Sequence, residues 1–232
     1  MKQFYLILAG IFFTLSLYSQ SDSTYFSGAI KINFKKYKKE SEHAYRKGDV
    51  ERGKFLFDSL VDHRLAGTTF DDFTLKQANG KKLKLSSIKK PTVIITYASW
   101  CVQGKGEVAA LNKLAQKYKG DVKFVVLFWD RKPNMVKIAR KFNKHISVCY
   151  AHEHYNNDAP IVAALKHTLG LPTSYYLDEN LKVVEIKRCG VKECPKAVTA
   201  EKSLAMNYNS FLEGLSLLLI SKDLNKEMLA TK

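Results

Sequence analysis

The chain has 232 residues, of which 46% are hydrophobic and 26% are charged. This balance is typical of a globular protein and excludes general disorder, and the length allows one domain with extensions or two small domains. The formal charge of +16 comes from 38 Lys and Arg against 22 Asp and Glu. Because the lysines are scattered and form no arginine-rich or aromatic-interleaved patch, they indicate a solvated surface, and we expect no nucleic-acid partner.

Residues 1–20, MKQFYLILAGIFFTLSLYSQ, have the pattern of a signal peptide. One lysine precedes an apolar stretch from Phe4 to Tyr18, and small and polar residues follow. The stretch is shorter than the ~20 residues that span a bilayer comfortably. We therefore expect an exported protein of the periplasm or cell envelope, or a secreted one, with no stable membrane insertion after signal cleavage.

Residues 21–67 are polar and rich in Lys, Glu and Tyr, and they predict a helical extension to the domain that follows. The apolar side chains that recur at helical spacing predict its buried face; they are Phe55, Leu56, Leu60 and Leu65.

A β-hairpin is predicted next, in FDDFTLKQANGKKLKLSSI. Phe73 and Leu75 alternate on one side of Asn79-Gly80, and Leu83 and Leu85 alternate on the other. Asn-Gly between two alternating runs is a strong hairpin signal.

Strands and helices alternate after Pro91. The buried strands are VIITY, VKFVVLFW and ISVCY, and the helices between and after them are EVAALNKLAQKY, MVKIARKF and PIVAALKHTLG. SYYLDENLKVVEIKRCG predicts two further strands around a turn, and a last amphipathic helix covers about 201–221. The sequence predicts one α/β domain over 68–222, with helices on both faces of a mixed sheet, and a C-terminal tail over 223–232.

The stretch ASWCVQGKGE places Trp100 and Cys101 at the first junction between a strand and a helix. A dithiol redox site would have a second cysteine three positions after the first, and here that position is Gly104. A cysteine in the first turn of a helix lies at the positive end of the helix dipole, which favours the nucleophilic thiolate.

The order of elements and this junction resemble the thioredoxin fold, and more narrowly the exported TlpA/ResA-type thiol–disulfide oxidoreductases related to the redoxins. The segments that match are FDDFTLKQANGKKLKLSSIKKPTVIITYASWC, GEVAALNKLAQKY and LGLPTSYYLDENLKVVEIKRCG. The resemblance implies a thioredoxin-like fold with thiol–disulfide exchange, protein or peptide thiols and disulfides as partners, and no cofactor.

The resemblance also implies roles for individual residues. Cys101 would be the catalytic thiol, and Glu107 would be the acidic residue kept beside the active-site cysteines. Trp100 and the segment Leu171-Pro172-Thr173 would hold the substrate peptide, with a cis peptide bond before Pro172 exposing the Leu171 backbone for pairing.

Because Gly104 replaces the second cysteine, the sequence does not decide which thiol would release a substrate from a mixed disulfide with Cys101. An external thiol could release it, or Cys189 or Cys194 could, because the last strand is expected to run back toward the active-site edge. Alternatively, Cys189 and Cys194 pair with each other and close the loop CGVKEC. Cys149 is expected to be a small buried strand residue.

The loss of the second cysteine also favours a rival of another class, a redox-inactive thioredoxin-like module that binds peptides or proteins. His152, Glu153 and His154 offer donors for a metal, but two histidines in a polar loop are usually solvated, and we expect no metal site.

Overall fold

The computed structural model describes residues 24–100, 106–166, 169–188 and 199–230. The predicted signal peptide and Cys101, Gly104, Cys189 and Cys194 lie outside these residues. The described helices are α2 (Phe26–Arg46), α3 (Val50–Leu60), η1 (Val61–Leu65), η2 (Leu85–Ser87), α4 (Glu107–Lys117), α5 (Lys132–Ala139), η3 (Asn156–Asp158), α6 (Ala159–Leu165) and α7 (Ala200–Ala230).

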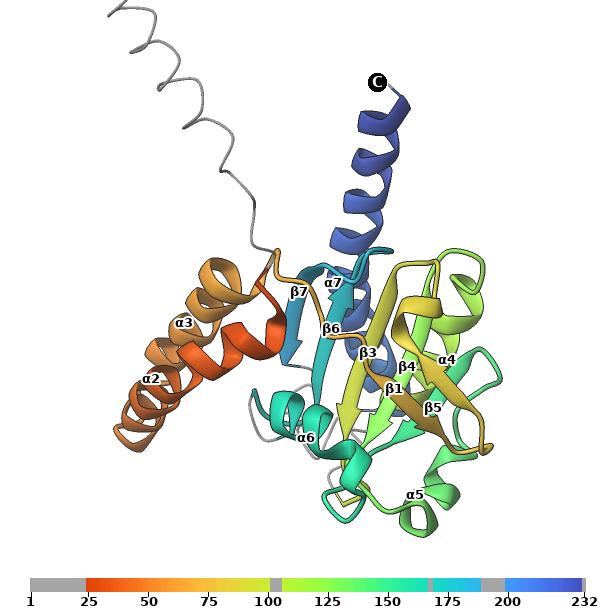
Figure 1. The fold of residues 1–232 in the computed structure, drawn as a ribbon, viewed down its shortest axis with the longest axis horizontal. Helices are drawn as coiled ribbons and strands as arrows, with labels where there is room; N and C mark the ends of the chain where they lie inside the picture. The colour runs from red at the N-terminus through yellow and green to blue at the C-terminus, as the bar shows by residue number, and fades with distance from the viewer. Residues whose placement is uncertain (1–23, 101–105, 167–168, 189–198, 231–232) are drawn as a thin grey trace, which may run out of the picture.

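Seven strands form one mixed sheet in the order β2-β1-β5-β4-β3-β6-β7 (Figure 1). The pairs β3–β4 and β4–β5 are parallel, and the other four pairs of neighbouring strands are antiparallel. The strands are β1 (Thr74–Gln77), β2 (Lys82–Lys84), β3 (Thr92–Tyr97), β4 (Lys123–Phe128), β5 (Ile146–Tyr150), β6 (Thr173–Leu177) and β7 (Val183–Arg188). This arrangement confirms the predicted thioredoxin-like α/β fold, including the β1–β2 hairpin around Asn79-Gly80.

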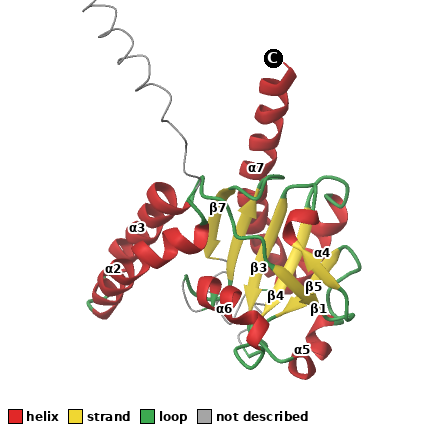
Figure 2. Cartoon of the chain, in the orientation of Figure 1, coloured by secondary structure: helices red, strands yellow, loops and turns green. Residues whose placement is uncertain are grey.

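Helices cover both faces of the sheet, as the continuous apolar strands require (Figure 2). All six residues of β3 are buried, and successive side chains point to opposite faces. Ile94 belongs to the apolar cluster beneath α2, α3 and α6, whereas Val93 and Ile95 belong to the cluster beneath α4, α5 and α7. The central strand therefore joins two cores.

The N-terminal helical extension packs into the first of these cores. Phe26, at the start of α2, is fully buried and lies 5.2 Å from the ring of Phe70 and 5.7 Å from that of Tyr175, between ring centroids. The Phe26 N–H also donates to the Thr69 carbonyl at 2.8 Å. The extension therefore packs directly on the sheet and contributes to its hydrophobic core.

The face that α3 buries differs in part from the predicted one. Leu60 and Leu65 are buried, but Phe55 is 58% exposed, and Phe57 is buried in its place. Gly53 faces the ring of Tyr45 so closely that a Cβ there would come within 2.4 Å of it. This contact with α2 sets the rotation of α3, and a pattern of apolar residues along α3 alone does not reveal it.

The last helix continues through residues 223–230, where the sequence predicted a tail. No glycine or proline follows Gly214, so nothing in this stretch ends a helix. The second half of α7 runs out beyond the sheet (Figure 1). Among the described residues, no helix has both the length and the apolarity needed to cross a membrane.

Candidate functional site

The candidate site lies where β3 ends. The chain leaves Tyr97 and passes through Ser99, whose N–H and hydroxyl both donate to the Asp130 carboxylate, at 2.7 and 2.5 Å. Asp130 is buried and follows β4, so it ties the turn after β3 to the turn after β4. Trp100 comes next and is 78% exposed, which is unusual for a large aromatic side chain.

Glu107 is the first residue of α4, and its side chain is only 3% exposed. Its Oε1 accepts a hydrogen bond of 2.6 Å from the hydroxyl of Tyr97, the last residue of β3. Tyr97 in turn stacks on Phe128 with ring centroids 5.9 Å apart. A carboxyl group is therefore held inside the protein at the start of α4, six positions after Cys101 in the sequence.

Gly106 precedes α4 in a left-handed conformation with φ of +83°. A Cβ on this residue would lie 2.7 Å from the backbone of Leu204 in α7. Both the backbone angle and the close approach of α7 therefore require glycine here.

The segment before β6 lies beside this junction. The peptide bond between Leu171 and Pro172 is cis, as the sequence predicted. The Thr173 N–H donates to the Thr96 hydroxyl at 3.3 Å, and this hydroxyl donates to the Thr173 carbonyl at 3.2 Å. Since Thr173 is also the Cα partner of Thr96 between β3 and β6, the cis peptide is fixed next to the end of β3.

The end of β7 reaches the same place, because Arg188 is the Cα partner of Thr173. The Arg188 Nε donates to the Leu169 carbonyl at 2.9 Å, three residues before Pro172. The prediction that the last strand returns to the active-site edge is therefore confirmed as far as Arg188.

The helical extension surrounds the Arg188 guanidinium, and we call the group of Arg188, Leu169, Tyr37, Tyr45 and Phe57 the Arg188 cluster. Arg188 donates to the hydroxyls of Tyr37 and, at 3.2 Å, Tyr45. Its Cζ lies 4.3 Å from the centroid of the Phe57 ring. Burial raises the pKa of Tyr37, and the nearby positive charge of Arg188 opposes this rise. The cluster thus connects α2 and α3 to the segment before the cis peptide.

Cys149 is a free, fully buried cysteine in β5. Burial raises the pKa of its thiol to about 12, although the charge of Lys123 opposes the rise. The thiol is therefore protonated and inert near neutral pH, as predicted for a structural cysteine.

The residues His152, Glu153 and His154 make other contacts. The backbone N–H of His152 donates to Asp158 at 2.9 Å, and Glu153 pairs with Lys166. Within the part of the chain that the structure describes, no cluster of His, Cys, Asp and Glu could hold a metal ion.

Two contacts in the site were not predicted from the sequence. The contact of Ser99 with Asp130 spans 31 positions, and that of Arg188 with Tyr37 spans 151. An aspartate directly after a buried strand, at the edge where parallel strands end, was a usable signal for the first contact. Nothing in the local pattern signals the second.

A model of the AhpC/TSA family matches residues 66–186, more than half of the chain. The chain belongs to the AhpC/TSA family. Membership in the AhpC/TSA family confirms the redoxin relationship that the sequence indicated.

Individual relatives are distant in sequence. The thiol:disulfide interchange protein DsbE of Pseudomonas fluorescens biotype C is 25% identical over 164 residues, which cover 70% of this chain and 86% of that protein. A solved structure of a putative thiol:disulfide interchange protein DsbE from Chlorobium tepidum is similar with a TM-score of 0.49 and 21% identity, covering 66% of this chain and 97% of that one. A secreted Mycobacterium tuberculosis disulfide oxidoreductase has a TM-score of 0.42 and 15% identity, covering 59% and 94%.

Proposed function

We propose that this AhpC/TSA-family protein carries out thiol–disulfide exchange through Cys101, on protein or peptide disulfides. The observation that supports this most strongly is the buried Glu107 carboxylate, bonded to Tyr97 at the start of α4. Burying a carboxylate is costly, and a surface that only binds peptides has no use for one six positions after its cysteine. The name of the P. fluorescens relative, a thiol:disulfide interchange protein, agrees with this function.

The reaction has two steps, each of which exchanges one disulfide for another. The Cys101 thiolate attacks one sulfur of the substrate disulfide, the S–S bond breaks, and the other sulfur leaves as a thiolate that takes up a proton. A second thiolate then attacks the Cys101 sulfur of this mixed disulfide, so that the substrate leaves with both sulfurs reduced and the attacking thiol is bonded to Cys101. Reduction of that bond by a further external thiol returns Cys101 to the thiolate. We assign Glu107 the movement of protons to and from these sulfurs.

The second thiolate comes from outside or from Cys189 or Cys194. The position of Arg188 supports the internal route, because Cys189 is the next residue and Arg188 already neighbours Thr173 in the sheet. The alternative, a disulfide between Cys189 and Cys194, would leave the external route.

The peptide around the substrate disulfide is held at Trp100, Leu171, Pro172 and Thr173. The exposed Trp100 ring offers an apolar surface, and the cis peptide at Pro172 leaves the neighbouring backbone of Leu171 accessible to an extended chain. Export by the predicted signal peptide, to the periplasm, the cell envelope or the medium, would place these groups where protein disulfides persist.

A redox-inactive binding module remains the second candidate, and the glycine at position 104 favours it. The same peptide-binding residues would serve that function without any covalent step. The two candidates differ in whether Cys101 is needed.

The test compares the wild type with Cys101→Ser and, as a matched control, Cys149→Ala. Reduction of a disulfide-bonded model peptide by excess external thiol is followed, with the uncatalysed rate subtracted. We expect the Cys101→Ser variant to lose the catalysed rate and Cys149→Ala to keep it, since the Cys149 thiol is buried and protonated. A wild type that binds the peptide but shows no catalysed rate, with binding unchanged in Cys101→Ser, would establish the binding module instead.

Mapping the native disulfides by mass spectrometry, with alkylation before any reduction, distinguishes the two routes of release. A bond between Cys101 and Cys189 or Cys194 identifies the internal route. A bond between Cys189 and Cys194, with Cys101 alkylated, identifies the external one.

A further inference from the structure

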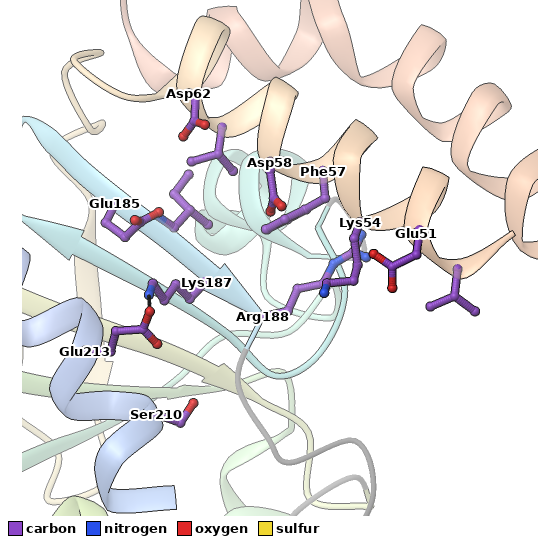
Figure 3. Close-up of a pocket in the computed structure, with 13 residues that line it drawn as sticks. Glu51, Lys54, Phe57, Asp58, Asp62, Glu185, Lys187, Arg188, Ser210 and Glu213 are labelled. Atoms are coloured by element: carbon purple, nitrogen blue, oxygen red, sulfur yellow. Dashed lines mark hydrogen bonds and ion pairs between the residues drawn. The ribbon is translucent and has the colours of Figure 1, made fainter.

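A second feature of the structure lies on the far side of β7 from β6. An open groove of about 730 Å³ runs between α3 and α7 with β7 along its floor, and we call it the β7 groove (Figure 3). Phe57 and Val61 of α3 and η1 supply apolar surface to it. Polar side chains line it from each of these elements. They are Glu51, Lys54 and Asp58 of α3, Asp62 of η1, Glu185, Lys187 and Arg188 of β7, and Ser210 and Glu213 of α7.

The floor of the groove is a sheet edge that is only half covered. β7 is the last strand of the sheet. Its beginning is paired, because the Val183 N–H donates to the Thr68 carbonyl at 2.9 Å and the Gly67 N–H donates to the Val183 carbonyl at 2.8 Å. Farther along, among the described residues, no chain segment pairs with the outer side of β7.

The open part presents backbone groups outward. The Ile186 N–H donates to the Oε1 of the neighbouring Glu185 at 2.8 Å, although Ile186 is the Cα partner of Tyr175 in β6. In an antiparallel pair, residues alternate between those that exchange both backbone hydrogen bonds and those whose N–H and C=O point away from the partner. The N–H and C=O groups of Ile186 therefore point away from β6, and so do those of Arg188, two residues later.

Carboxylates outnumber cations around this edge, five against three among the lining side chains, in a protein with a formal charge of +16. Asp58 of α3 and Asp62 of η1 project toward β7, which carries Glu185 (Figure 3). Burial raises the pKa of Glu185, and repulsion from Asp62 and Asp58 raises it further against the opposing effect of Lys187. Two of the three lining cations already have partners: Lys187 lies 3.0 Å from Glu213, and the Arg188 guanidinium contacts Tyr37, Tyr45 and Phe57. The described residues place no cation within 4 Å of the Asp58 or Asp62 carboxylate, and both side chains are exposed.

We propose that the β7 groove binds an extended polypeptide segment bearing lysine or arginine side chains, which adds a strand to the open edge of β7. The backbone of the segment would pair with the outward N–H and C=O groups of Arg188 and the C=O of Ile186, and a carbonyl of the segment would replace Glu185 Oε1 as the acceptor of the Ile186 N–H. Its basic side chains would lie between Asp58, Asp62 and Glu185 and relieve their mutual repulsion. The segment belongs to a partner, and its capture needs no redox step, so this inference does not depend on the chemistry of Cys101.

The probe is a short, blocked, fluorescent peptide of alternating threonine and lysine, and binding is measured by anisotropy at low and at physiological salt. The test variant is the double substitution Asp58→Asn and Asp62→Asn. The control is Glu42→Gln with Asp121→Asn, which changes the net charge equally at exposed carboxylates that pair with Lys38 and Lys222, outside the groove. We expect about five- to tenfold weaker binding in the test variant and little change in the control.

Two further measurements separate strand addition from attraction by charge alone. The same peptide with N-methyl groups on alternate residues keeps its charge but cannot pair as a strand, and we expect it to bind more weakly. Hydrogen exchange of residues 183–188 should slow when the unmethylated peptide is bound.

Equal binding of the methylated peptide, equal weakening in both double variants, or no change in exchange along β7 would overturn the proposal. Sedimentation of the peptide-free protein tests the other occupant of the groove, a second copy of the chain. A dimer that the Asp58→Asn and Asp62→Asn substitutions dissociate would assign the edge to self-association and would also overturn the proposal.

Discussion

Replacing Arg188 by alanine should loosen the attachment of the helical extension to the candidate site. The change removes the charged hydrogen bond from Nε to the Leu169 carbonyl, 2.9 Å long, and the contact of the guanidinium with the Phe57 ring at 4.3 Å. A hydrogen bond from a charged group contributes about 1.5–3 kcal/mol and an exposed cation–π contact about 0.5–1 kcal/mol, so we expect the free energy of unfolding to fall by about 2–4 kcal/mol.

Urea unfolding measures this loss, and limited trypsin digestion measures the loosening, because α2 is rich in lysine. The Arg188→Lys variant keeps the charge but not the planar fork of donors, so it should fall between wild type and Arg188→Ala. Arg140→Ala, at an exposed position after α5, is the matched control and should change the free energy of unfolding by less than about 0.5 kcal/mol.

The reasoning is refuted if Arg188→Ala unfolds at the same urea concentration as Arg140→Ala and α2 is cleaved no faster. In that case the Arg188 cluster would not connect the extension to the segment before Pro172. If stability falls but exchange through Cys101 is unchanged, the cluster holds the extension without positioning the site.

Three further substitutions test the site and its surroundings. Gly106→Ala should lower the free energy of unfolding by about 1–3 kcal/mol in urea titrations, because its φ is +83° and the new Cβ would collide with Leu204. Tyr97→Phe should cost about 1.5–3 kcal/mol in the same titrations by removing the hydrogen bond to Glu107, and it should slow exchange in the peptide assay. In the Cys149→Ala variant, the free energy of unfolding should fall less than in the wild type as the pH rises into the alkaline range. The pKa of this thiol is raised from 9.0 to about 12 in the folded state, so its stabilising effect is full below pH 9 and falls above it. Between pH 8 and 10 the wild type should lose about 1.4 kcal/mol more than the variant in calorimetry, and equal losses would contradict the assignment.

Much of the fold could be predicted because its signals are local. The runs that form β3, β4 and β5 are almost wholly apolar, and Asn79-Gly80 marks the hairpin turn. The cis peptide at Pro172 followed from the resemblance to a family. The junction between β3 and α4 was also visible, since Trp100 and Cys101 directly follow a buried strand.

What could not be predicted depends on contacts between distant elements. The rotation of α3, which buries Phe57 and exposes Phe55, is set by its packing on Tyr45 of α2. The β7 groove requires carboxylates from α3 and β7, more than a hundred positions apart, to meet at one sheet edge. No periodicity within either segment encodes such a meeting.

The central claim, covalent exchange through Cys101, is tested most directly by trapping the mixed disulfide. The protein is reduced, freed of reductant and mixed with a disulfide-bonded peptide, and the adducts are located by mass spectrometry at successive times. The account predicts that the first adduct forms on Cys101, that it is absent from Cys101→Ser, and that Cys149 stays unmodified in the folded protein. A first adduct on another cysteine that forms equally fast in Cys101→Ser would contradict it.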